Sequence, residues 1–158
     1  MTEHQPLPAL GLAELLLLAT RVVVERVHDR LAAEGFAVRP AHGYTFQLLA
    51  TSGGASGAEL AEHLGVTKQA AAQLLDGLHQ AGYITRRPDP RDHRARLAVL
   101  TERGWACIHA ATAAWREAET AAAALLGADR LQALREDLHR LAADGGALQP
   151  PLRLRPIW

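Results

Sequence analysis

Two long stretches of the sequence, one toward each end, repeat mostly apolar or small residues at alternating steps of three and four. The first stretch runs through Leu10, Ala13, Leu17, Thr20, Val24, Val27 and Leu31. The second runs through Trp105, Ile108, Thr112, Trp115, Glu119, Ala122 and Leu126. This spacing places the repeated residues on one face of an α-helix. We therefore expect two long amphipathic helices, and in so small a chain their apolar faces favour burial against a second copy of the chain.

The composition agrees with one small, mainly helical domain. The chain has 158 residues, which is the length of a single domain and excludes a large multidomain enzyme. Ala and Leu dominate the apolar residues, whereas Phe and Tyr occur only twice each, so strong helix formers outnumber strand formers. A content of 49% hydrophobic against 22% charged residues is typical of a folded protein rather than a disordered one.

The single cysteine and the start of the chain bear on location. Cys107 has no partner for an internal disulfide, and no basic and apolar leader opens the sequence, so we expect a cytoplasmic protein. Charged residues such as Glu14 and Arg21 interrupt the first apolar stretch, which predicts no membrane anchor. Cys107 beside Ile108 favours a small core residue over a redox-active thiol.

The middle of the chain predicts two short helices joined by a tight turn. Ser56 and Glu59 fit a capping box, and an apolar face follows up to Gly65. Thr67 can cap the next helix, which ends at Gly82 and whose predicted buried side carries Ala70, Leu74, Leu75 and Leu78. This order matches a helix-turn-helix, in which the second helix enters the major groove of DNA.

An arginine-rich β-hairpin follows these helices. After Tyr83 and a turn cluster at residues 88–90, Arg94, Arg96 and Ala98 alternate with Ala95, Leu97 and Val99, which predicts a polar and an apolar face. Residues 86–103 hold six Arg against three acidic residues, although the whole chain balances 17 basic with 17 acidic residues. The planar fork of Arg suits phosphates and a narrow minor groove. With further helices near residues 44–49 and from residue 128 on, the prediction is a mainly α, winged helix-turn-helix fold of about six helices plus a hairpin wing.

The central segment resembles the MarR family of bacterial transcriptional regulators. The motifs that carry the resemblance are GVTKQAAAQLLDGLHQAGYI and DPRDHRARLAVLTERG, and the flanking long helices extend it to about residues 7–145. The resemblance implies a dimer whose terminal helices intertwine. It divides the chain into a helical dimerisation region (1–39 and 101–146), a DNA-binding lobe (40–100) and a Pro-rich tail (147–158).

The resemblance also implies which residues touch DNA. Base and phosphate contacts fall on Thr67, Lys68, Gln69 and Gln73, and the minor-groove contact of the wing falls on Arg91 or His93. Asp92 and Arg94 match an acid and base pair that braces the hairpin. Candidates for further backbone contacts are Arg86, Arg87 and Arg96.

Two kinds of effector site are expected from the same resemblance. A small phenolic or lipophilic ligand would lie among His42, Tyr44, Phe46, Trp105 and His109, with the alternative that these aromatic residues belong to the core. Zinc as an effector would take Glu25, His28, His42 and His109, with the alternative that these histidines are scattered over the surface. DNA binding itself requires no cofactor.

The sequence therefore predicts a regulator, by family default a repressor, that binds double-stranded DNA sequence-specifically as a homodimer on a pseudo-palindromic operator. An enzyme is disfavoured because no paired nucleophile and base or phosphate-binding Gly loop is present. The alternatives are a helical dimer that binds DNA without sequence preference or binds a protein partner, and a dedicated metal-binding protein.

Overall fold

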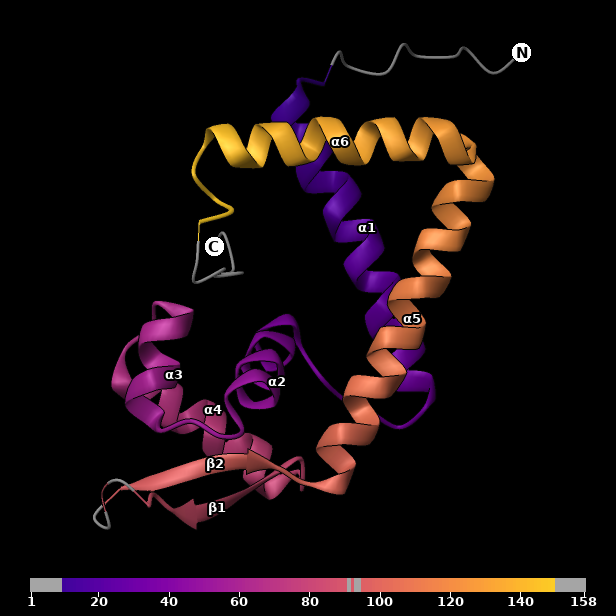
Figure 1. Ribbon diagram of the computed structural model, residues 1–158. Helices are drawn as coiled ribbons and strands as arrows, with labels where there is room; N and C mark the ends of the chain where they lie inside the picture. The colour runs from indigo at the N-terminus through magenta and orange to yellow at the C-terminus, as the bar shows by residue number, and fades with distance from the viewer. Residues whose placement is uncertain (1–9, 91, 93–94, 150–158) are drawn as a thin grey trace.

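The computed structural model describes residues 10–90, 92 and 95–149. It contains six helices and one two-stranded hairpin, which confirms the predicted fold class. The elements are α1 (Leu12–Ala33), α2 (Pro40–Ser52), α3 (Gly57–Leu64), α4 (Lys68–Gln80), β1 (Ile84–Pro88), β2 (Arg96–Leu100), α5 (Glu102–Leu126) and α6 (Ala128–Asp144). Figure 1 shows α1, α5 and α6 as the sides of an open triangle, with α2, α3, α4 and the hairpin gathered into a lobe below it.

Local capping interactions fix the helix-turn-helix as the sequence predicted. The Ser56 hydroxyl accepts a hydrogen bond from the Glu59 amide at 3.2 Å, and the Glu59 carboxylate accepts one from the Ser56 amide at 2.7 Å. Gly65 ends α3 with a φ of 68°, a left-handed conformation that favours glycine. The Thr67 hydroxyl accepts from the Ala70 amide at 3.1 Å and begins α4.

The core of the lobe lies where α2, α3 and α4 meet the hairpin. Its largest buried side chains include Leu49, Leu60, Leu78, Tyr83 and Ile84. The predicted position of Ala70 in this core is wrong: Ala70 is exposed and Ala71 is fully buried. With Thr67 as the cap, residues 71, 75 and 78 share the inner face of α4, and this helical register leaves residue 70 outside.

The hairpin alternates as predicted, but the burial of its two faces differs from the expected polar and apolar division. Ala98, expected on the polar face with Arg96, is buried, while Leu97 and Val99 lie half-buried on the other face. The cause is a third extended segment, because the Ala55 amide donates to the Ala98 carbonyl at 3.0 Å and the Ala98 amide donates to the Ala55 carbonyl at 2.8 Å. Ala55 and Ala98 are both part of the lobe core, and the sequence pattern of the hairpin alone carried no sign of this pairing.

The triangle of long helices packs only in part. Val27 and Leu31 of α1 are buried with Ala114 of α5, whereas the rest of the apolar stripe on α1 is not buried within the described part of the chain. The residues of α6, which the structure describes in full, include none that is buried. Exposed apolar side chains therefore line the triangle, among them Leu12, Leu15, Leu18, Val22, Trp115, Leu125, Leu134 and Leu141. None of the described helices has the length and apolar character needed to span a membrane.

Candidate nucleic-acid interface

The first turns of α4 present a polar face to solvent. Thr67, Lys68, Gln69 and Gln73 are all exposed. Gln69 and Gln73 lie on the side of α4 opposite Ala71, and Thr67 and Lys68 lie at its N-terminal end. The backbone N–H groups at the start of a helix add partial positive charge there, which favours a phosphate. The structure thus brings together the four residues expected on α4, at the end of the helix that a helix-turn-helix presents to base edges.

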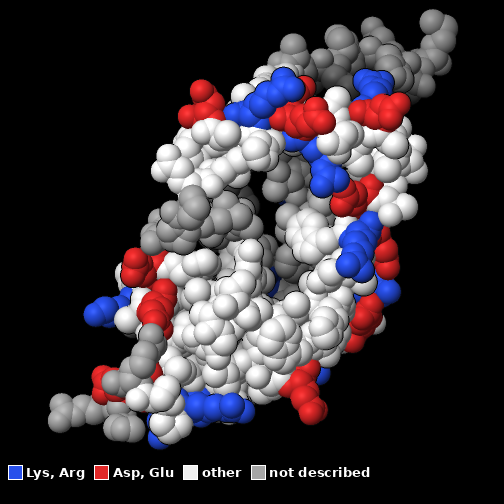
Figure 2. All heavy atoms as spheres, in the orientation of Figure 1, with Lys and Arg blue, Asp and Glu red and all other residues white. Residues whose placement is uncertain are grey.

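Basic side chains of the hairpin add to this surface. Arg86, Arg87 and Arg96 are exposed, and the antiparallel register pairs Arg87 with Leu97 and Pro88 with Arg96. Figure 2 shows basic side chains along the lower edge of the molecule, where Figure 1 draws the hairpin. Although the charge of the whole chain sums to zero, these three basic side chains therefore lie together on the hairpin.

One member of this set has a partner that the sequence analysis missed. The Arg86 guanidinium forms an ion pair with the carboxylate of Asp76 on α4. This contact joins β1 to α4 and places an acidic group beside an arginine that was expected to meet DNA phosphates. The ten-residue separation of the two residues gives no periodic signal, so only the hairpin's position against α4 reveals the pair.

The tip of the hairpin is described only in part. Arg91, His93 and Arg94, the predicted tip residues, lie outside the described residues. At the base of the tip the Asp89 amide donates to the Ala95 carbonyl at 3.1 Å, and the Ala95 amide donates to the Asp92 carbonyl at 2.9 Å. Asp92 is exposed and Asp89 is buried.

The five predicted effector residues occupy different environments. Phe46 lies in the lobe core, where its ring centroid is 5.5 Å from that of Tyr83, as the core alternative expected. Tyr44 and His42 are half-buried on α2. Trp105 and His109 are exposed on α5 with ring centroids 6.5 Å apart.

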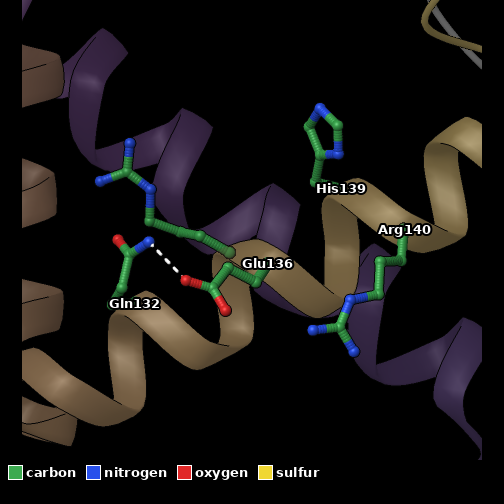
Figure 3. A pocket seen from close by; sticks show the side chains of 5 residues that line it. Gln132, Glu136, His139 and Arg140 are labelled. Atoms are coloured by element: carbon green, nitrogen blue, oxygen red, sulfur yellow. Dashed lines mark hydrogen bonds between the residues drawn. The ribbon is translucent and has the colours of Figure 1, made fainter.

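Hollows on the surface lie elsewhere. One of about 490 Å³ is lined by Gln132, Arg135, Glu136, His139 and Arg140 of α6. Figure 3 shows these side chains, with the 2.9 Å hydrogen bond from the Gln132 amide to the Glu136 carboxylate. A second hollow of about 260 Å³ lies at the junction of α5 and α6. Neither hollow is lined by any of the predicted effector residues.

His28 of α1 and His42 of α2 make local contacts. His28 donates from Nδ1 to the Val24 carbonyl at 2.8 Å, and His42 Nδ1 accepts from the Arg39 amide at 3.2 Å. Burial, together with the charges of Arg39 and His28, lowers the pKa of His42. Across the described residues, no group of three or more His, Cys, Asp or Glu side chains is close enough to hold a metal ion. A single chain therefore does not gather Glu25, His28, His42 and His109 into a zinc site.

Cys107 is buried among the core residues of the lobe. Burial raises the pKa of its thiol to about 11, and the nearby charge of Arg103 opposes this shift only in part. A buried thiol that stays protonated is a weak nucleophile, so its environment is that of a packing residue.

Comparison with known proteins agrees with this geometry. Residues 38–95 match the sequence model of the MarR family. The HTH-type transcriptional repressor Rv2887 of Mycobacterium tuberculosis is 36% identical over 98 residues, which cover 62% of this chain and 70% of that protein. The HTH-type transcriptional repressor Mb2911 of Mycobacterium bovis matches with the same identity and coverage.

Solved structures extend the similarity to the long helices. RV1404 from Mycobacterium tuberculosis superposes with a TM-score of 0.72 at 26% identity, over 87% of this chain and 94% of that chain. Apo MarR from E. coli has a TM-score of 0.70 at 21% identity, over 85% of this chain and 98% of its own. A MepR variant from S. aureus bound to an oligodeoxyribonucleotide shares the fold with a TM-score of 0.62 at 19% identity, over 85% and 98% of the two chains. The chain therefore belongs to the MarR family, as a DNA-binding transcriptional regulator with a winged helix and not an enzyme.

Proposed function

We propose that the chain is a homodimeric repressor that binds an operator with two half-sites related by two-fold symmetry. The observation that carries the proposal is the division of its surface. The polar face of α4 and the arginines of the hairpin occupy the lobe, whereas most of the exposed large apolar side chains occupy α1, α5 and α6. The curated relatives are named as repressors, which supports the direction of regulation.

The apolar triangle supports the homodimer. Leu12 is 60% exposed and Leu125 is 83% exposed. Leaving such apolar side chains in contact with water is unfavourable in free energy, and burial against a partner removes this penalty. A two-fold dimer places the same patch of both subunits in contact and so covers both copies at once. Because α6 buries none of its residues in its own chain, we expect the partner subunit to supply its packing surface.

The lobe supplies two kinds of DNA contact. The amide groups of Gln69 and Gln73 can each pair with adenine in the major groove, which gives sequence discrimination. Lys68 and the hairpin arginines bind phosphates, which gives affinity and orientation without sequence information. The oligodeoxyribonucleotide bound to the MepR variant supports DNA binding by a protein of this fold.

We extend the proposal to control by a small effector. Trp105 and His109 offer adjacent rings on the exposed side of α5, and α2, which carries Tyr44 and His42, contacts the same helix. A planar phenolic ligand would stack on such rings and contact both the lobe and the dimer helices. Zinc is the second candidate effector, and it requires ligands from the partner subunit because one chain does not assemble the four predicted residues.

The test is DNA binding measured by fluorescence anisotropy at fixed salt. Purified protein is titrated with its own upstream intergenic DNA and with a scrambled duplex, first with a chelator and then with zinc or a simple phenolic acid. A specific regulator prefers its operator by about a thousandfold or more. Gln69→Ala with Gln73→Ala should remove most of this preference, whereas Gln132→Ala on α6 serves as a matched control that keeps it.

Other results would contradict parts of the proposal. Equal binding to a selected operator and to scrambled DNA would favour the non-specific architectural alternative. Sedimentation as a monomer at the concentrations that bind DNA would overturn the homodimer. Selective binding that neither zinc nor the phenolic acid changes would overturn control by these two effectors.

A further inference from the structure

One side chain at the start of α5 contacts both halves of the molecule. The Arg103 guanidinium carbon lies 5.6 Å from the ring centroid of Phe36 and 4.9 Å from that of Tyr83. Its Nη2 donates a hydrogen bond to the Gly35 carbonyl at 3.0 Å. Gly35 and Phe36 follow the end of α1, and Tyr83 follows the end of α4. Arg103 therefore joins three segments that are far apart in the sequence.

The rings on either side of Arg103 belong to different packing units. Tyr83 is buried in the lobe core, where it also contacts Phe46. Phe36 packs against both the lobe core and the small cluster of Val27, Leu31 and Ala114 between α1 and α5. The Phe36 and Tyr83 ring centroids are 6.5 Å apart, and the guanidinium is close to both. The charged group thus lies at the seam between the lobe and the long helices.

The backbone around Arg103 leaves little freedom at this seam. The Thr101 hydroxyl donates to the Gly82 carbonyl at 2.6 Å, and the Thr101 amide donates to the Tyr83 carbonyl at 3.0 Å. A Cβ atom at Gly104 would lie 2.3 Å from the Tyr83 carbonyl oxygen, so only glycine permits the approach. The end of α4 is thereby held against the first turn of α5, and Arg103 extends this connection to the end of α1.

We infer that Arg103 is a positioning residue that sets the orientation of α4 relative to the dimer helices, and through it the half-site spacing that the protein selects. The inference rests on the proposed function, in which α1, α5 and α6 form the dimer. A guanidinium is needed here because it is planar and has several donors, so it can bond a carbonyl and contact two aromatic rings at the same time. The compact ammonium group of Lys makes fewer of these contacts at once.

The experiment measures spacing preference with duplexes built from an operator that the wild-type protein has selected from a random pool. The half-sites are kept constant while their separation is changed by one or two base pairs, and a single half-site serves as a further probe. For Arg103→Gln we expect at least a tenfold loss of affinity at the preferred spacing, a flattened spacing profile and half-site affinity within twofold of wild type. Arg116→Gln makes the same charge change at an exposed position of α5 and should keep the wild-type profile.

A second variant separates positioning from folding. Arg103→Lys keeps the charge but not the fork, so its spacing profile should lie between those of wild type and Arg103→Gln. Circular dichroism and thermal unfolding establish that each variant is folded. An unchanged spacing profile in both variants would overturn the inference, and so would equal losses on half-site and full operator. A wild-type protein that shows no spacing preference would instead overturn the proposed two-site dimer, whatever the variants do.

Discussion

Asp76 on α4 forms an ion pair with Arg86 on β1 and so connects the hairpin to the helix. The carboxylate is 58% exposed and the guanidinium 39% exposed, so water screens the pair and its contribution to stability is small. In the proposed DNA complex its larger effect would be electrostatic, because the pair would withhold one arginine from the DNA and place a negative charge near the phosphates.

Removal of that charge should strengthen DNA binding without improving selectivity. In Asp76→Asn, Arg86 becomes free to meet a phosphate, and the slope of log K against log salt should steepen by about 0.9 for one more neutralised phosphate. Affinity for scrambled DNA should rise at least as much as affinity for the operator. Asp144→Asn, the same charge change on α6, is the control. A weaker or unchanged affinity for scrambled DNA in Asp76→Asn would contradict this assignment.

Lys68 and Gln73 on the same helix should behave differently from each other. Lys68→Ala should weaken binding to all duplexes and reduce the salt slope by about 0.9, because it removes one phosphate contact. Gln73→Ala should leave that slope unchanged and cost about 1–3 kcal/mol of discrimination at one base position. Titrations of operator, single-mismatch and scrambled duplexes at several salt concentrations distinguish the two. If the two variants behave in the reverse way, Lys68 contacts a base and Gln73 a phosphate, which contradicts the assignment.

The capping box at Ser56 should matter for stability. Ser56→Ala leaves the Glu59 amide without its acceptor and should lower the free energy of unfolding by about 1 kcal/mol. Chemical denaturation at fixed protein concentration measures the change. Thr120→Ala on α5 removes a hydroxyl whose hydrogen bond goes to a carbonyl within the helix, and it should be neutral or slightly stabilising. Equal losses in the two variants would mean that the cap has no special role.

His42 should make stability depend on pH. Its pKa is lowered below the ordinary value of 6.5, chiefly by burial, so the unfolded chain takes up a proton at a pH where the folded chain does not. The contribution of His42 to stability is therefore fully present above about pH 6.5 and is lost as the pH falls through that value toward the folded pKa. Denaturation between pH 5 and 8 should show a shallower dependence for His42→Gln than for wild type or for the exposed control His139→Gln. A wild-type slope retained in His42→Gln would assign the effect to another group.

Cys107 should be unreactive in the folded protein. With its pKa raised to about 11 and its side chain buried, the thiol has neither the charge nor the access that alkylation requires. We expect slow labelling by a maleimide under native conditions and rapid labelling of one thiol per chain in denaturant. Rapid native labelling, or a change in DNA affinity after mild peroxide, would restore a redox role.

Local signals in the sequence were reliable guides to this fold, and signals that depend on tertiary contacts were not. Ser56 and Thr67 cap their helices as predicted, because each cap involves residues only three positions apart. The burial of Ala98 was missed because it packs in the lobe core with Ala55, a residue outside the strand pattern.

The same distinction applies to the candidate site. The exposed residues of α4 followed from helical periodicity and from the family motif. The partners of Arg86 and Arg103 did not, since Asp76 and Gly35 lie ten and 68 positions away along the chain. Phe46 was expected in an effector pocket or in the core, and only the packing of its ring on Tyr83 identified the core.

In the proposed dimer, the exposed surface of α6 would link regulation to the concentration of the protein. If α6 buries its apolar residues against a second chain, the stability of each folded subunit rises with the abundance of the protein. At the lowest cellular levels the proposed repressor would then unfold as its dimer dissociates, and the operator would be released without any effector. The protein concentration at which repression begins would therefore depend on the dimerisation equilibrium as well as on the affinity for the operator.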